Sequence, residues 1–237
     1  MGIGDVFRAI HSPVETFSRI VESNPSLFDG LLFFIFVQTF VLGFCYMFMS
    51  VMPENYGMGS IIIMLIGTSP LPFLSSPGLV SYLISMFLSF VEILILSLVF
   101  HGFSKFVNKS PGSFSSIFTL LSISQIVSIF PVLIIPLTNI SYTMSQVFVV
   151  PMFGYIFVTT FWKYLLYGIS VRTNYRLPEI KVAIAFILSF LVFFLLYPLV
   201  AAVFLSQIGQ GVLDIGTFGL PSVRIAKESV SNVLGSK

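Results

Sequence analysis

Five long apolar runs constrain the fold of this chain more than any other feature of its sequence. A helix of about 20 apolar residues crosses the roughly 30 Å hydrocarbon core of a bilayer. Such a helix also satisfies its own backbone hydrogen bonds, which hydrocarbon requires of any spanning segment. We therefore predict an all-α fold, a polytopic transmembrane bundle of about five spans within residues 27–206. The runs lie at about residues 27–50, 79–104, 114–138, 147–170 and 182–206.

Composition excludes most other classes of protein. Of the 237 residues, 57% are hydrophobic and 8% are charged, whereas soluble domains have about 45 to 50% apolar and about 25% charged residues. So few charges cannot cover a water-soluble surface. The net charge is +2 and the basic residues are scattered, so nucleic-acid binding is not expected. Cys45 is the single cysteine, which excludes a disulfide framework.

Residues 3–23 have a different pattern, with apolar side chains three and four residues apart on one helical face. The sequence SPVE at residues 12–15 has the order of a capping box, and it predicts two short helices that meet near Ser12. The apolar face has two interpretations: it lies in the headgroup layer, or it packs on the cytoplasmic end of the bundle. Residues 1–26 are therefore predicted to be an amphipathic, cytoplasmic or interfacial segment.

The basic residues predict the orientation of the bundle. Seven Lys or Arg residues lie in the N-terminal segment and in the loops after the second and fourth runs, and none lies at 51–78 or 139–146. The positive-inside rule places the N-terminus in the cytoplasm and, after five spans, the C-terminal tail at 207–237 outside. The short apolar stretch Met58–Thr68 is predicted to be an interfacial or re-entrant segment.

Glu92 is the one acidic residue in the interior of a predicted span, and Ser85 and Ser89 share its helical face. Gln125 in the third run can donate an amide hydrogen to it across the bundle. Because no basic residue is expected deep in the bundle, we expect Glu92 to be largely protonated. These four residues are the candidate intramembrane polar site. They form either a polar pathway with a protonatable carboxylate, or a seam of small residues that joins two helices.

The end of the fourth run has the residue types that anchor a span at the headgroup layer. Trp162, Lys163 and Tyr167 are predicted to be interfacial anchors, because amphipathic rings and a lysine that reaches toward water belong at that depth. The sequence has no catalytic motif and no phosphate-binding loop, and His11 and His101 lack the spacing of metal ligands. We therefore expect no enzymatic activity, no cofactor and no metal.

Several short motifs occur in a characteristic order along the chain. An amphipathic segment with a proline precedes the first span, PGSF at residues 111–114 opens the third, WKYLLYG at 162–168 ends the fourth and KVA at 181–183 begins the fifth. Together they resemble the Yip domain family, five-span membrane proteins named for their interaction with Ypt and Rab GTPases. The resemblance covers about residues 5–205. It implies a helical bundle with a cytoplasmic N-terminus, in agreement with the charge distribution.

The resemblance also guides the functional prediction. Eukaryotic members act in vesicle trafficking and membrane shaping, and they have a long soluble N-terminal region. The chain lacks that region, which puts small-GTPase binding in doubt and favours a short prokaryotic-type member in a plasma membrane. We therefore predict a non-enzymatic scaffold or adaptor, whose partners are the lipid bilayer, other membrane proteins or a second copy. The alternative is a small-molecule, ion or lipid transporter that uses the face around Glu92.

Overall fold

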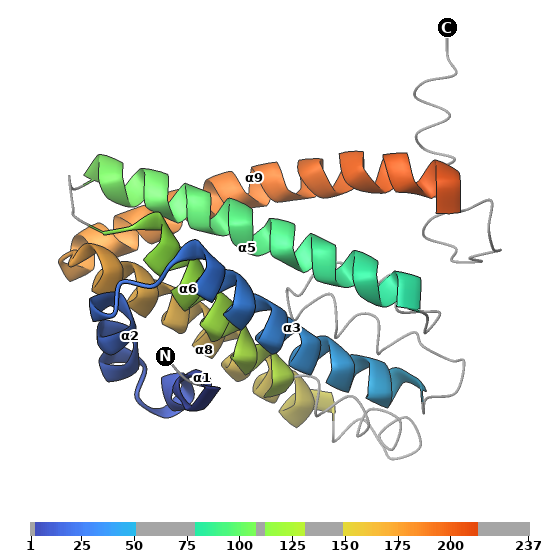
Figure 1. Cartoon of the computed structure of the whole chain (residues 1–237), viewed down its shortest axis with the longest axis horizontal. Helices are drawn as coiled ribbons and strands as arrows, with labels where there is room; N and C mark the ends of the chain where they lie inside the picture. Colours follow the sequence, from blue (N-terminus) through green and yellow to red (C-terminus); the bar gives the residue numbers. More distant parts are fainter. Residues whose placement is uncertain (1–2, 51–78, 108–111, 131–148, 213–237) are drawn as a thin grey trace, which may run out of the picture. The chain divides into compact units, whose positions relative to one another are not determined.

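The computed structural model describes residues 3–50, 79–107, 112–130 and 149–212. This part of the chain has seven α-helices, one short 3-10 helix and no strand, which confirms the all-helical prediction. The stretch Met58–Thr68, the loop at 139–146 and the tail after residue 212 lie outside the described residues. The elements are α1 (Ile3–His11), α2 (Pro13–Glu22), α3 (Leu27–Ser50), α5 (Leu79–Val107), α6 (Phe114–Ser124), η2 (Gln125–Ser128), α8 (Val149–Tyr175) and α9 (Glu179–Val212) (Figure 1).

Contacts divide the chain into two compact units, Met1–Tyr197 and Pro198–Lys237. The described part of the second unit is the last part of α9. All packing described below belongs to the first unit. The predicted boundaries at residues 26 and 206 stay predictions.

The apolar runs correspond to helices, but the number of spans stays a prediction. Four runs match α3, α5, α8 and α9, whereas the third begins as α6 and continues as η2. Within the described ranges, one helical stretch, Met86–Val107, has the length and the mean hydropathy of 2.1 that suit a membrane span. Leu27–Gly43 and Phe114–Ser128 are shorter apolar helices.

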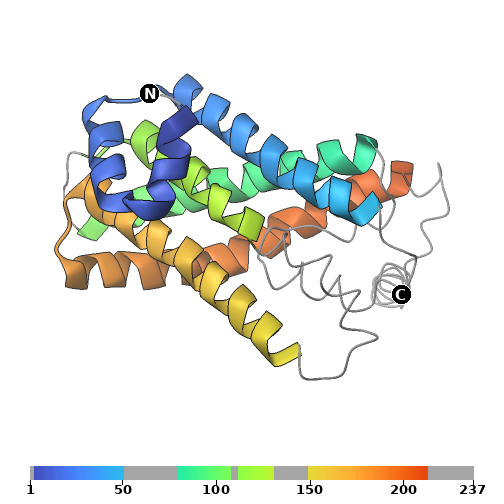
Figure 2. The ribbon, with the colours of Figure 1, turned by 90° about the horizontal axis from the view of Figure 1, so that it is seen from below.

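Helix α6 lies at the centre of the first unit, in contact with α3, α5, α8 and both N-terminal helices (Figure 1 and Figure 2). Its residues Ser116–Ser124 are all buried. Several of its hydroxyls donate to carbonyls of the same helix, as Ser122 Oγ does to Phe118 O at 2.7 Å. These side chains are therefore small and already satisfied, so that neighbouring helices can approach closely. Gly30 of α3 marks one such approach, because a Cβ there would lie 2.7 Å from Thr119 Oγ1.

Serine caps begin two of the bundle helices. Ser113 Oγ accepts a hydrogen bond from the Ser116 amide at 3.1 Å at the start of α6. Before α3, the Ser26 amide donates to Asp29 Oδ2 at 2.8 Å, and the Asp29 amide donates to Ser26 Oγ at 3.2 Å. This reciprocal pair is a capping box with aspartate in the usual place of glutamate. Both caps satisfy amides that have no partner within their own helix.

The N-terminal hairpin, α1 with α2, confirms the predicted break at Ser12. The predicted capping box is not formed, because Ser12 makes no side-chain cap hydrogen bond among the described residues. An ion pair between Asp5 and Arg19 joins the two helices instead. The apolar face packs on α3, α6, η2 and α8, in agreement with docking on the bundle rather than on lipid. Its residues Val6, Ala9, Phe17 and Ile20 are at most 1% exposed.

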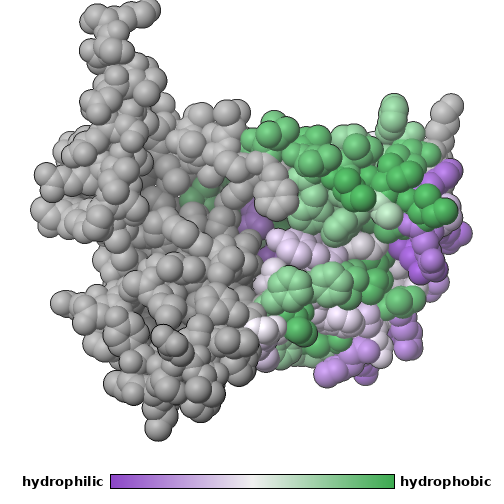
Figure 3. All heavy atoms as spheres, turned by 180° about the vertical axis from the view of Figure 1, so that it is seen from behind, coloured by the Kyte–Doolittle hydropathy of each residue, from purple (hydrophilic) through white to green (hydrophobic). Residues whose placement is uncertain are grey.

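Helix α9 contacts the bundle through aromatic side chains. The Phe190 ring centroid lies 6.0 Å from that of Phe100 in α5 and 5.0 Å from that of Tyr164 in α8. The outer side of α9 has exposed aliphatic residues such as Ile187 and Leu191. On the face in view in Figure 3, hydrophobic residues cover much of the described part, and the most hydrophilic residues gather mainly at one end. An aliphatic exterior with a polar end is typical of a protein in contact with lipid.

Candidate functional site

Three of the four residues predicted as an intramembrane polar site are buried in the bundle. Glu92 and Ser89 of α5 are 6% and 2% exposed, and Gln125, the first residue of η2, is 1% exposed. Gln125 Nε2 donates to Tyr167 Oη of α8 at 2.7 Å. Glu92 lies near the same tyrosine, so α5, η2 and α8 meet at this point. The side chain of Ser85 lies outside the described residues.

Lys163 lies in this site and not at a water-exposed end of α8. Its side chain is 3% exposed, its Nζ lies 5.8 Å from the centroid of the Tyr167 ring, and it interacts electrostatically with Glu92. Both Lys163 and Tyr167 are buried inside the bundle, whereas the sequence predicted exposed anchors at the membrane interface. The reason is the length of α8, which continues for 12 residues beyond Lys163 to Tyr175, about 18 Å of helix. Trp162, the third predicted anchor, is half-buried beside the cluster that holds the N-terminal hairpin.

A buried lysine near Glu92 changes the expectation for this carboxyl group. The expectation that Glu92 is protonated depended on the absence of a basic residue in the interior of the bundle, and Lys163 removes that premise. Ionised groups in a low-dielectric interior persist when they are paired. We call Glu92, Lys163, Tyr167, Gln125 and Ser89 the polar centre. Its chemistry allows two roles, a charge pair that joins α5 to α8 or a route for a proton between a carboxylate, an amine and a phenol.

A second polar contact lies where α5, α6 and the end of α8 meet. His101 Nδ1 and Tyr175 Oη are 2.6 Å apart, and Asn174 Nδ2 donates to Ser113 O at 2.9 Å. Burial raises the pKa of the Tyr175 hydroxyl, so this group keeps its proton. Gly112 lies against the same residues, since a Cβ there would be 2.6 Å from Asn174 O. The glycine of the PGSF sequence thus lets the start of α6 contact the end of α8. No cluster of three or more His, Cys, Asp or Glu that could hold a metal lies within the described ranges.

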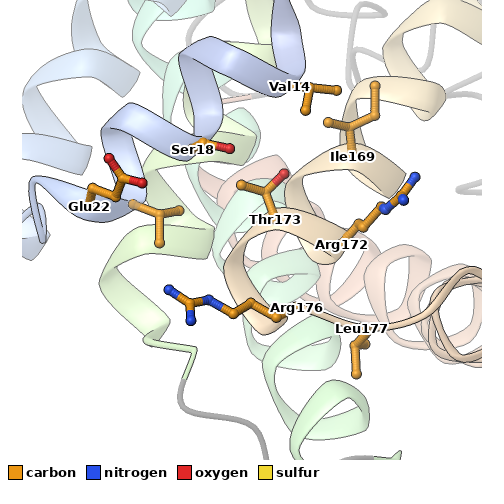
Figure 4. Close-up of a pocket in the computed structure, with 9 residues that line it drawn as sticks. Val14, Ser18, Glu22, Ile169, Arg172, Thr173, Arg176 and Leu177 are labelled. Atoms are coloured by element: carbon orange, nitrogen blue, oxygen red, sulfur yellow. The ribbon is translucent and has the colours of Figure 1, made fainter.

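A cleft of about 450 Å³ opens between α2 and the end of α8 (Figure 4). Arg172 at its rim forms an exposed ion pair with Glu179, with 3.3 Å between Nη1 and Oε1. Arg176 has a left-handed φ of 50° where α8 ends. From the sequence these arginines indicated only orientation, because a cleft between two segments far apart in the chain has no local signal. The lining residues are Val14, Ser18, Val21, Glu22, Ile169, Arg172, Thr173, Arg176 and Leu177.

Comparison with known proteins identifies the family. A model of the Yip1 domain matches residues 7–202, whereas searches of the curated proteins and of the solved structures gave no match. The matched range contains the N-terminal hairpin from residue 7 onward, the polar centre and the cleft. It confirms the family resemblance predicted from the sequence. Because the match extends over most of the 237 residues, the chain belongs to the Yip1 domain family of membrane proteins.

Proposed function

We propose that this chain is a non-enzymatic membrane scaffold that crosses the bilayer five times, with its N-terminus in the cytoplasm, and organises partner proteins or membrane shape. Family membership supports the location in a membrane. The Lys and Arg residues on one side of the proposed spans support the orientation. The observation that carries the proposal is the N-terminal hairpin, a charged element fixed to the bundle.

The N-terminal hairpin is built to present its polar face. Phe17 and Ile20 are buried against the bundle, so these side chains are not available for insertion into headgroups. The opposite face exposes residues of both signs, among them Arg8, Glu15 and Glu22. A fixed pattern of opposite charges favours specific recognition of a protein partner, whereas insertion into lipid needs a continuous apolar face, and the exposed apolar side chains here are single ones such as Phe7 and Val14.

Site-specific photo-crosslinking in native membranes tests the scaffold. A photoreactive residue in place of Glu15, which is exposed on the N-terminal hairpin, should give one protein adduct of defined mass. The same residue in place of Leu191, which is 59% exposed on α9, is the control and should give lipid adducts. The charge swap Arg8→Glu with Glu15→Arg, which keeps the net charge, should abolish co-purification of the partner. If the two positions give the same lipid adducts, the scaffold proposal is wrong.

Cysteine labelling tests the topology. In a Cys45→Ser background, Arg176→Cys should react with an impermeant reagent only after the cytoplasmic side is opened. Ser141→Cys, in the proposed outer loop at 139–146, is the control and should react from outside. Labelling of residue 176 from outside would reverse the proposed orientation.

The polar centre favours a second candidate function, proton-coupled transport. Two buried ionisable side chains, the acid Glu92 and the base Lys163, interact within the bundle, and such residues commonly mark ion or proton routes. A transporter should lose proton-coupled flux in proteoliposomes on Glu92→Gln while it stays folded. If the chain is a scaffold, neither the wild type nor the Glu92→Gln variant should give specific flux. The substitution should then change only the stability of the protein.

A further inference from the structure

The cleft between α2 and α8 combines two kinds of lining that suit an amphipathic ligand. Arg172 and Arg176 supply guanidinium groups, and Thr173 and Ser18 supply hydroxyls. Together with Glu22, the ionisable side chains that line the cleft have a formal charge of +1, two positive and one negative. The remaining lining is aliphatic, and the volume lies within the range of about 300 to 1,000 Å³ that is typical of small-ligand sites. Figure 4 shows Thr173 between the two arginines, with the Arg176 side chain extending to the side of Glu22 and the Arg172 side chain to the opposite side.

Both arginines can turn to a ligand at little cost. The pair between Arg172 and Glu179 is exposed, with 59% and 80% of the two side chains accessible, so water and salt weaken it. Among the described residues, Arg176 forms no ion pair. A guanidinium offers planar, paired donors that match the oxygens of a phosphate group. The cleft is therefore suited to bind an anion that carries phosphate.

We propose that the cleft binds the headgroup phosphate of an anionic phospholipid, with Arg172 and Arg176 as its phosphate-binding residues. The aliphatic surface beside the arginines supports a lipid as the source of the phosphate. Val14 of the lining is 60% exposed, and Ile180, next to Glu179, is 77% exposed. These side chains can contact an acyl chain while the guanidinium groups hold the headgroup. The same basic residues lie where the proposed orientation places the cytoplasmic headgroup layer.

Binding measurements on the purified full-length chain test this site. The delipidated protein in neutral detergent receives short-chain phosphatidylglycerol, short-chain phosphatidylcholine or inorganic phosphate, and native mass spectrometry with thermal unfolding reports binding. Arg176→Gln removes one cleft arginine, and Arg8→Gln is the matched control, since Arg8 is exposed on α1 and outside the cleft lining. Arg176→Lys keeps the charge but not the paired donors. Micelles have no two sides, so the result does not depend on the proposed topology or on scaffolding.

We expect phosphatidylglycerol to bind more tightly than phosphatidylcholine, and Arg176→Gln to weaken it about tenfold, as expected for a lost charge-assisted hydrogen bond. Arg176→Lys should weaken binding less, and Arg8→Gln should leave it within about twofold. Equal losses in Arg8→Gln and Arg176→Gln would mean diffuse electrostatic attraction and overturn the site. Equal binding of inorganic phosphate would overturn the lipid assignment. If Arg176→Gln does not fold, Thr173→Val replaces it, with an expected loss of about threefold; an unchanged affinity would then overturn the site.

Discussion

Helices α6 and α9 differ in what they leave exposed: the central part of α6 is buried on all sides, whereas α9 has one exposed aliphatic side. Ser116–Ser124 of α6 are all buried although several are serines, whereas α9 leaves Ile187 and Leu191 exposed. In a soluble domain the aliphatic side chains would be buried and the serines would face water, because aliphatic side chains fill its core. Lipid tails are as apolar as leucine, so exposure of Leu191 costs little if α9 lies in a bilayer, and small residues such as those of α6 let helices pack closely. In this bundle, burial therefore does not follow polarity alone, and the size of the buried serines is one property that can explain their position.

The largest expected effect comes from the charged group inside the bundle. Lys163→Met keeps the length of the side chain and removes its amine, which leaves Glu92 without the basic group that interacts with it. If the two side chains form a buried charge pair, the loss of one partner should lower the free energy of unfolding by about 3 kcal/mol. Unfolding in mixed micelles with increasing SDS measures this change.

A double-mutant cycle separates the pair from other contacts of Lys163. Glu92→Gln together with Lys163→Met should recover part of the loss, with a coupling energy of at least about 1 kcal/mol. Additive losses would show that Glu92 and Lys163 act independently, and the polar centre would then not join α5 to α8.

The next effect compares a leucine of α6 with a leucine of α9. Leu120 is fully buried and Leu191 is 59% exposed. Leu120→Ala leaves a cavity between helices and should cost about 2 kcal/mol of unfolding free energy. Leu191→Ala removes a side chain that faces the surroundings of the bundle and should cost less than about 0.5 kcal/mol. Similar costs at both positions would mean that another helix or chain covers the outer side of α9.

Much of the helical organisation could be predicted from the sequence. Apolar runs gave the bounds of α3 to the residue, and the order of Ser12 and Pro13 gave the break between α1 and α2. The helix type in the third run could not be predicted, because α6 changes to a 3-10 turn at Gln125 within a continuous apolar stretch. Hydropathy reports the polarity of a stretch but not its hydrogen-bond pattern, so it does not show this change.

The candidate site was predicted in part for a related reason. A single carboxylate or amide in an apolar run must find a partner, which is why Glu92 and Gln125 could be predicted as buried bundle residues. The apolar run stops near residue 170 and so predicts that Lys163 lies at the membrane surface, whereas α8 continues to Tyr175. Helical periodicity places residues on one face of their own helix but does not say which neighbour that face contacts.

A smaller effect is expected at the contact between α6 and the end of α8. A Cβ on Gly112 would meet the ring of Tyr175 and lie 2.6 Å from the backbone oxygen of Asn174, so Gly112→Ala forces the two segments apart. We expect a loss of about 1 to 2 kcal/mol in unfolding free energy. Gly168→Ala in α8 is the matched control, because nothing lies within 4 Å of a Cβ there. It should be neutral or stabilise by up to about 1 kcal/mol. A Gly112→Ala variant as stable as the wild type would show that the start of α6 and the end of α8 can move apart without loss of stability.

The smallest expected effect concerns the serines of α6 and distinguishes size from hydrogen bonding. Ser122 Oγ donates to Phe118 O of its own helix, and the side chain is fully buried. If small size is what the centre of the bundle requires, Ser122→Ala should change the unfolding free energy by less than about 0.5 kcal/mol, because an intrahelical serine bond adds little. Ser122→Leu should cost at least about 1 kcal/mol by overpacking, although it makes the helix more apolar. Unfolding in the same micelles measures both variants. A stable Ser122→Leu or a strongly destabilised Ser122→Ala would show that polarity, rather than size, holds α6 at the centre.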